Sequence, residues 1–247
     1  MVKEEEYVEY KGQKLFIEDA EFLEKYKKRI LYTIKNNFIS EIAITRGNED
    51  IYNSGDLKKL KNLKELDIRD TAIKDLTYEK LPKSIEVIYA NRCMKLKNYN
   101  LKNLNKLKIW MIRDTAIKDL TYEKLPEGIE VIYADWCMKL KNYNLKNLNK
   151  LKELKIGGTA IKELTYDKLP KSIEVIYARG CKNLTKCSLK NLKNLKKLDI
   201  AYSGIKKLLP EDIPDGLERL VVSNKQDISE IKKDPRFKNI EVSELLL

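Results

Sequence analysis

The sequence repeats itself every 44 residues, and this self-similarity constrains its fold more than any other feature. The segment Asp-Thr-Ala-Ile-Lys-Asp-Leu-Thr-Tyr-Glu-Lys-Leu-Pro begins at Asp70 and again at Asp114, and a close variant begins at Gly158. Each 44-residue segment contains two units of 22 residues with similarly spaced apolar residues. Because one such unit cannot bury its own apolar face, successive units must stack to build a continuous core.

The two units of each segment share a leucine and isoleucine pattern but differ at one inward position. Residues 63–73 read Leu-x-x-Leu-x-Ile-x-x-Thr-x-Ile, and residues 85–96 read Ile-x-x-Ile-x-Ala-x-x-Cys-x-x-Leu. This pattern resembles the leucine-rich repeat family, whose units are about 20–29 residues long. The alternation of Thr and Cys, with Gly-Thr-Ala-Ile-Lys-Glu-Leu at residues 158–164, is similar to repeats of plant TIR-type immune receptors. Since no nucleotide-binding or TIR domain accompanies the repeats, no immune function is inferred.

The resemblance implies an α/β solenoid with a curved parallel sheet on its concave side. Short helical, 3-10 or irregular segments would return the chain along the convex side. We expect about nine units over residues 39–236, each with one strand, at a spacing of about 4.8 Å. The ninth unit is the weakest, because Asn224 or Lys225 stands where Thr or Cys is expected. The second position of successive units alternates from Lys64 to Glu218, which predicts a ladder of opposite charges across the strands.

Both ends of the chain depart from the repeat and are predicted to cap it. Residues 1–38 form the predicted N-terminal cap, in which residues 7–17 alternate around a Lys-Gly pair and indicate a hairpin. Residues 237–247 restart the repeat pattern and are predicted to form a capping strand. A helix is expected from about Asp19, and its apolar face is expected to comprise Leu23, Tyr26, Ile30 and Ile34.

The residue types needed for common catalytic sites are missing. Histidine is absent, which excludes Ser-His-Asp and Cys-His catalysis and every His-ligated metal site. The sequence has only nine glycines and no phosphate-loop motif, so it gives little basis for a nucleotide-binding site. We therefore expect a protein that is not an enzyme and that uses no cofactor.

The cysteines fit a structural role better than a chemical one. Cys93, Cys137 and Cys181 recur at the position that Thr fills in alternate units, where free cysteine behaves as a small buried hydrophobe. A metal shared by Cys181 and Cys187 is the alternative, but no Cys-x-x-Cys motif supports it. Unpaired cysteines indicate a reducing compartment. No stretch is long and apolar enough to span a membrane, and residues 1–6 do not resemble a secretory signal. We expect an intracellular, cytoplasmic monomer.

The resemblance places the third, fifth, seventh and eighth residues of each unit on the concave face. Six of the eight arginines fall there, but only two of the lysines, and eight acidic residues balance these cations. Near the middle of the stack these positions form one apolar and aromatic block, bordered by Arg and Asp. This composition is typical of a protein-binding hot spot. The predicted binding residues are Arg69, Tyr89, Arg92, Met111, Arg113, Asp114, Tyr133, Asp135, Trp136, Tyr177, Arg179 and Tyr202.

The alternative is that Tyr and Val occur there only because they favour strands. It explains Trp136 poorly, because units 85–106 and 129–150 are identical except at two positions, both on the predicted concave face. Those differences are Asn91 against Asp135 and Arg92 against Trp136.

Three functions remain open at this stage. The first is a scaffold or adaptor that binds a protein partner on the concave face. The second follows from the net charge of +12: lysines on the convex side would bind RNA, DNA or another anionic surface. The third is a structural component of a larger assembly.

Overall fold

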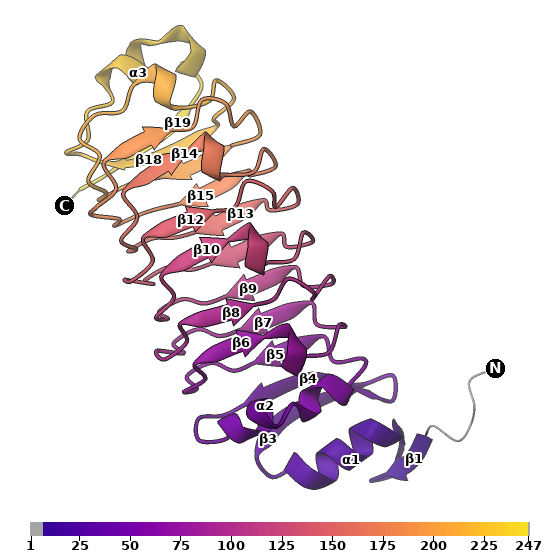
Figure 1. Ribbon diagram of the computed structural model, residues 1–247. Helices are drawn as coiled ribbons and strands as arrows, with labels where there is room; N and C mark the ends of the chain where they lie inside the picture. Colours follow the sequence, from indigo (N-terminus) through magenta and orange to yellow (C-terminus); the bar gives the residue numbers. More distant parts are fainter. Residues whose placement is uncertain (1–6, 247) are drawn as a thin grey trace.

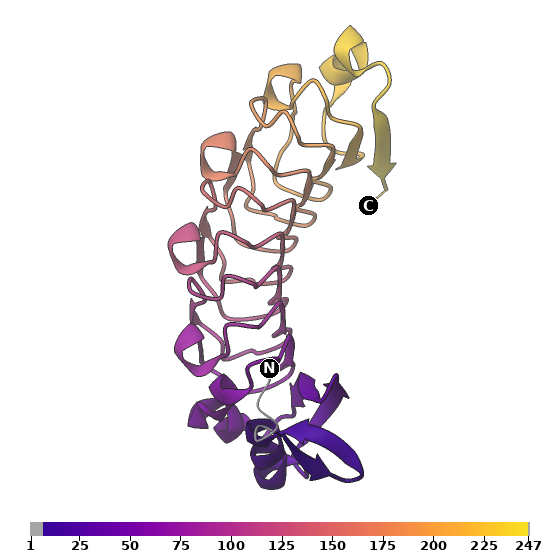
Figure 2. The same ribbon diagram turned by 90° about the vertical axis from the view of Figure 1, so that its right-hand side faces the viewer.

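The computed structural model describes residues 7–246, which form one bowed stack of short strands (Figure 1). An 11-stranded sheet runs the length of the stack in the order β19-β18-β17-β15-β13-β11-β9-β7-β5-β4-β3. Figure 2 shows this sheet on the inner side of the bow and the 3-10 turns on its outer side. The predicted α/β leucine-rich-repeat solenoid is confirmed.

Each 22-residue unit contributes one strand to this sheet. Neighbouring unit strands are parallel. Their paired residues lie 24 positions apart between the first two units, as in Ile42 with Leu66, and 22 positions apart from there on, as in Leu66 with Ile88. The middle residue of each three-residue strand is buried, so the fourth position of the repeat supplies the core. The nine unit strands are β4 (Phe38–Ile44), β5 (Glu65–Asp67), β7 (Val87–Tyr89), β9 (Ile109–Met111), β11 (Val131–Tyr133), β13 (Glu153–Lys155), β15 (Val175–Tyr177), β17 (Lys197–Asp199) and β18 (Arg219–Ser223).

The returning segments follow the 44-residue period rather than the 22-residue one. Parallel strand pairs join the two units of each segment: β6 (Asp75–Thr77) with β8 (Asn98–Asn100), β10 (Asp119–Thr121) with β12 (Asn142–Asn144), and β14 (Glu163–Thr165) with β16 (Lys186–Ser188). A 3-10 turn follows the first strand of each pair: η3 (Tyr78–Lys80), η4 (Tyr122–Lys124) and η5 (Tyr166–Lys168). A later turn, η6 (Pro210–Asp212), continues the row.

A row of buried Thr and Cys side chains closes the turn after each unit strand from β5 to β15. The Thr71 hydroxyl donates to the carbonyl of Ile68 (2.7 Å), and the Cys93 thiol of the next unit donates to the same carbonyl (2.9 Å). Thr71 Oγ1 and Cys93 Sγ lie 3.3 Å apart. The same arrangement joins Thr159 to Cys181, while at Cys137 the thiol donates to Ile112 O and contacts Thr115. We call this row the Thr–Cys spine.

The four cysteines are buried, free thiols, as predicted. Burial raises the pKa of the Cys93, Cys137 and Cys181 thiols, so they stay protonated and can donate. Cys187 lies apart from the spine in β16, paired in register with Leu164 of β14. Within residues 7–246, no group of three or more Cys, Asp or Glu could hold a metal ion.

The charge ladder is only partly formed. The ion pairs are Lys64–Glu86 (3.3 Å), Lys152–Glu174 (3.6 Å) and Lys196–Glu218 (3.0 Å). Among the described residues, the other neighbours in the column lie beyond ion-pair distance. All three pairs are exposed, so the ladder contributes little to stability.

The N-terminal cap differs from the prediction at its helix. Strands β1 (Tyr7–Tyr10) and β2 (Gln13–Phe16) form the expected hairpin, and α1 (Ile17–Tyr26) follows it. The prediction that this helix includes Ile30 and Ile34 is wrong, because both residues lie in β3 (Ile30–Lys35). That strand pairs antiparallel with β4 and begins the main sheet. The turn between them uses Asn36 and Asn37 at φ 51° and 68°, the left-handed geometry that favours tight hairpins.

At the C-terminal end, the expected last strand is present as β19 (Glu241–Leu245), parallel to β18. In the ninth unit, Gln226 takes the place of the missing Thr or Cys. Its side chain accepts from the Ser223 N–H (2.8 Å) and donates to Ile200 O (3.2 Å). The remaining helical elements are α2 (Glu49–Ser54), η2 (Asp56–Lys59), α3 (Ser229–Lys233) and η7 (Pro235–Phe237).

One buried carboxyl lies between the cap and the first unit. Asp19 of α1 is fully buried and accepts a hydrogen bond from the Ile39 N–H of β4. Its other oxygen has no hydrogen-bond partner within residues 7–246. Burial raises the pKa of Asp19 from 3.8 to about 6. Between these values the folded chain keeps a proton that the unfolded chain has lost, so this carboxyl reduces stability as the pH rises.

We predict that Asp19→Asn stabilises the chain at pH 7 by roughly 1–3 kcal/mol, because the amide removes the buried charge. The difference between variant and parent should grow as the pH rises from 4 to 7. Urea unfolding at several pH values measures it. A difference that stays constant over this range would contradict the assignment.

Candidate functional site

The middle of the concave face carries a patch of apolar and aromatic side chains on three neighbouring strands. Third-position and fifth-position residues of β7, β9 and β11 stand opposite one another in register. All six side chains are half-buried, with their outward surface left open on the inner side of the bow. We call these residues the central patch: Val87, Tyr89, Ile109, Met111, Val131 and Tyr133.

Charged groups border the patch and hold its tyrosines. The Tyr133 hydroxyl donates to Glu153 (3.0 Å), and the Lys155 ammonium lies 3.9 Å from the centre of the Tyr133 ring. Burial, and next the bond to Glu153, raise the pKa of Tyr133. At the opposite border the Tyr89 hydroxyl donates more weakly to Glu65 (3.5 Å). The Tyr133 ring is therefore held more firmly than the Tyr89 ring.

The eighth position of the units has a backbone conformation that the sequence analysis did not anticipate. These residues follow the strand in a turn and have a left-handed backbone, with φ between 57° and 72° from the second unit to the eighth. Gly, Asp and Asn adopt this conformation readily, whereas bulky residues are strained there. Glycine at two of these positions was the sequence signal for the left-handed conformation. The residues are Asp70, Arg92, Asp114, Trp136, Gly158, Gly180 and Tyr202.

Trp136 combines this strain with exposure and a fixed ring. Its φ is 60°, and 47% of its surface is accessible. The indole lies against Gly158, since a Cβ atom built on that glycine would stand 2.8 Å from Trp136 Cε3. Next to it, Asp135 accepts a hydrogen bond from the Gly157 N–H (3.0 Å), as Asn91 does from the Arg113 N–H. The Asp135 carboxylate thus stabilises the turn of the next unit, whereas the Trp136 side chain is exposed to solvent.

Three of the predicted arginines are already paired with acidic residues. Arg69 binds Asp67 (2.6 Å), Arg92 binds Asp70 (3.1 Å) and Arg179 binds Asp199 (2.8 Å). Asp199 is buried, so the concave face has one exposed carboxylate fewer than predicted. Arg113 lies beside the central patch, and its guanidinium makes no ion pair within 4 Å among residues 7–246.

The outlying predicted residues do not join the central patch. Strand β13 separates Tyr177 from Tyr133, although Lys155 lies between the two rings, 5.3 Å from the Tyr177 ring centre. Tyr177 and Arg179 line a separate hollow of about 200 Å³. The Tyr202 hydroxyl donates to the carbonyl of Leu246, so this side chain fastens the C-terminal end.

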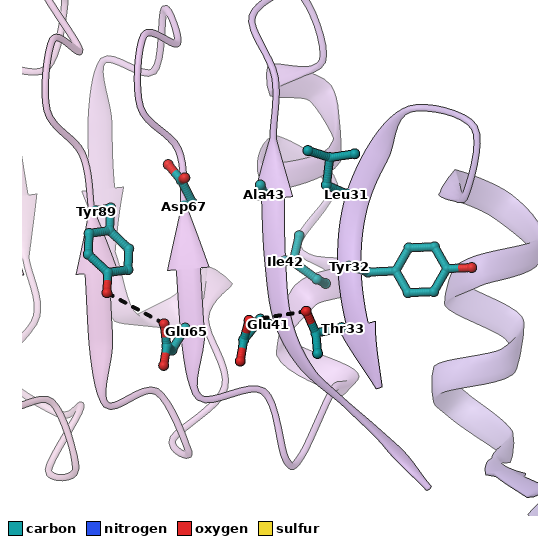
Figure 3. A pocket seen from close by; sticks show the side chains of 9 residues that line it. All are labelled: Leu31, Tyr32, Thr33, Glu41, Ile42, Ala43, Glu65, Asp67 and Tyr89. Carbon is teal, nitrogen blue, oxygen red and sulfur yellow. Dashed lines mark hydrogen bonds between the residues drawn. The ribbon is translucent and has the colours of Figure 1, made fainter. Parts of the chain in front are cut away.

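A hollow of about 240 Å³ lies at the N-terminal end of the concave face (Figure 3). Glu41, Glu65 and Asp67 line it beside Thr33 and Tyr89. The Lys35 ammonium holds the pKa of Glu41 below its usual value, and Arg69 pairs with Asp67. Glu65 accepts the weak hydrogen bond from Tyr89 and makes no ion pair among the described residues.

Sequence reasoning missed two exposed methionines. Met94 and Met138 are 63% and 69% accessible, and each directly follows a spine cysteine. Their position is outside the columns assigned to the concave face. The signal was present in the sequence, since an apolar residue occupies this place in five consecutive units.

No helix within residues 7–246 has the length and hydrophobicity needed to cross a lipid bilayer. The concave face presents aromatic rings, a guanidinium and carboxylates on one sheet.

Comparisons with known proteins bear on the fold. No protein-family model and no curated protein matches the sequence. Among solved structures, YopM of Yersinia pestis, a leucine-rich effector protein, is similar with a TM-score of 0.50 and 22% identity over 68% of this chain. This chain spans about half of that one, 53%. Another YopM, from Yersinia enterocolitica, has a TM-score of 0.48 and 21% identity over 75% of this chain and 36% of its own. Internalin C2 of Listeria monocytogenes has a TM-score of 0.48 and 16% identity over 84% of this chain and 81% of its own.

The first of these likenesses agrees with the leucine-rich-repeat fold, and at such identity it shows the fold alone. The finer resemblance to repeats of plant TIR-type receptors stays a prediction.

We predict that the Trp136 ring and Gly158 are energetically coupled. Gly158→Ala should cost about 1–2 kcal/mol for a side chain in the left-handed region, plus a clash with the indole. In a Trp136→Gly background only the first cost should remain. Chemical unfolding of the two single variants and the double variant measures the difference.

Gly180→Ala is the matched control, because its φ is similar (72°) and an added Cβ would meet nothing closer than 3.9 Å. It should cost the same in both backgrounds. Equal costs for Gly158→Ala in both backgrounds would show that the ring does not lie on this glycine.

Proposed function

We propose that this protein is a non-enzymatic scaffold that binds a partner protein through the central patch and Trp136. The observation that carries the proposal is an apolar and aromatic surface left open in the middle of the concave face. Soluble proteins seldom expose such surfaces without a use for them. Aromatic residues beside Arg, with a polar rim, are the composition found at interface hot spots.

The cost of keeping Trp136 supports a role in binding. A bulky residue in the left-handed region destabilises the fold by about 1–2 kcal/mol, and Gly158 and Gly180 occupy the equivalent position without this strain. Because the ring is already fixed against Gly158, binding would lose little side-chain entropy. We therefore expect that tryptophan is kept at position 136 for recognition of a partner rather than for packing of the fold.

Charges around the patch would orient the partner. Arg113 and Asp114 lie on the turn beside it, and Arg92 lies on the neighbouring turn. Among the described residues, Glu65 is the carboxylate without an ion pair in the hollow at the N-terminal end, and Lys197 is the cation without one in the hollow toward the C-terminal end. In that second hollow Arg179 pairs with Asp199, and Arg219 pairs with Glu241. Opposite charges at the two ends of a binding face favour one direction of docking.

The remaining parts of the proposal rest on composition. Four free, buried thiols are consistent with a reducing, intracellular compartment. The absence of histidine speaks against most acid–base and nucleophilic catalysis. The other two candidate functions are binding of RNA or DNA by the convex lysines and a purely structural role. Binding of RNA or DNA would require an affinity for these nucleic acids that falls steeply as the salt concentration rises.

We expect Trp136→Ala to weaken partner binding by about 2 kcal/mol, and Tyr133→Ala to weaken it as well, without unfolding the chain. Affinity purification from the source identifies the partner, and titration with each variant measures the loss. Tyr166→Ala is the matched control, because Tyr166 is similarly exposed (45%) but lies on a convex 3-10 turn. Partners that bind both concave variants as tightly as the parent would refute the proposed site.

A further inference from the structure

A second apolar surface runs along the edge of the stack, outside the concave face. It consists of the residue that follows each spine Thr or Cys in five consecutive units. The strands of these units are paired in register, and the spine side chains touch within each Thr–Cys pair, so the residues after them also lie in a row, about 4.8 Å apart. We call this row the edge strip: Ala72, Met94, Ala116, Met138 and Ala160.

The edge strip is open to solvent where its largest side chains stand. Met94 and Met138 are 63% and 69% exposed, and the three alanines, one between them and one on either side, are half-buried. Their spacing of two units is about 10 Å, close to the rise of two turns of an α-helix. At the N-terminal end, Ala72 and Met94 line a hollow of about 290 Å³ together with Glu49 of α2. Methionine adapts its shape to apolar partners, which suits it to a docking surface.

The charges on the two sides of the edge strip differ. On its convex side lie seven exposed lysines, none of which has a carboxylate within 4 Å among the described residues. Two of the three acidic residues interspersed with them, Asp75 and Asp119, accept hydrogen bonds from Asn side chains instead. On its concave side lie the Asp70–Arg92 ion pair (3.1 Å), Asp114 and Trp136. The seven lysines are Lys74, Lys95, Lys97, Lys118, Lys139, Lys141 and Lys162.

We propose that the edge strip binds an acidic, amphipathic segment of a partner protein. Apolar side chains two helical turns apart would contact Met94 and Met138, and Asp or Glu side chains beside them would meet the lysine side. An anionic bilayer fits less well, because its flat surface would also press against Asp114, which makes no ion pair among the described residues. The inference does not rest on the proposed concave site: none of the five residues of the edge strip belongs to that site, although its Arg92 also lines the hollow beside Met94.

Selection of random peptides of about 16 residues on the full chain tests this inference. Enriched peptides should carry two apolar residues about seven positions apart, flanked by Asp or Glu. Their affinity should fall at least tenfold in a Met94→Ser, Met138→Ser double variant and in a Lys95→Glu, Lys139→Glu double variant. Circular dichroism and thermal unfolding confirm that each variant is folded.

Two controls match these changes. Leu31→Ser alters a side chain as exposed as Met138 (69%) on β3, and Lys83→Glu with Lys171→Glu makes the same change of net charge elsewhere on the repeats. Both should alter affinity less than twofold, as should Tyr133→Ala, which separates this surface from the central patch.

Three results would overturn the inference. The first is a selection that enriches no peptide able to distinguish the parent from the methionine variant. The second is the enrichment of peptides without excess acid. The third is that the chain binds vesicles containing phosphatidylserine and loses this binding in the Met94→Ser, Met138→Ser variant, while its affinity for the selected peptides is unchanged in that variant. That result would assign the edge strip to a membrane.

Discussion

The turn that follows each strand is the constraint on which the rest of the structure depends. In two of these turns a single buried carbonyl, that of Ile68 or Ile156, receives both the Thr hydroxyl of its own unit and the Cys thiol of the next. Buried polar groups must be hydrogen-bonded, so this shared acceptor fixes the chain reversal and the stacking of units at once. The strands can be as short as three residues because the spine, rather than strand length, holds the register.

The same turn decides which residues are free to vary. To bring Thr or Cys inward, the residue before it must adopt a left-handed backbone and point outward. Its side chain then contributes little to the core, so charge, size and aromaticity can change there at the cost of local strain. Asp70, Arg92, Trp136 and Gly180 all fill this place in one stack. The fold thus presents a row of exposed, rigidly mounted side chains next to a uniform sheet.

The repeat period, the solenoid, the buried cysteines and the central patch were predictable from sequence, because each depends on a spacing that recurs many times. Features that occur only once in the chain were not predictable in this way. Ile30 and Ile34 fit a helix face as well as a strand, and only the Asn36–Asn37 turn decides between them. The pairing of Arg179 with Asp199 and the hydrogen bond from Tyr202 to Leu246 depend on side-chain directions that no periodicity encodes.

The alternation of Thr and Cys has a consequence for how such a chain can change length. A Thr unit and a Cys unit have different interiors, return segments and hydrogen bonds, and each is built to meet the other. Insertion or loss of a single unit would place two Thr units or two Cys units side by side and interrupt the spine. A Thr unit and a Cys unit could be gained or lost together without changing which kinds of unit are neighbours. Gene duplication in this protein is therefore expected to proceed in steps of 44 residues, and an engineered version should be lengthened in the same steps.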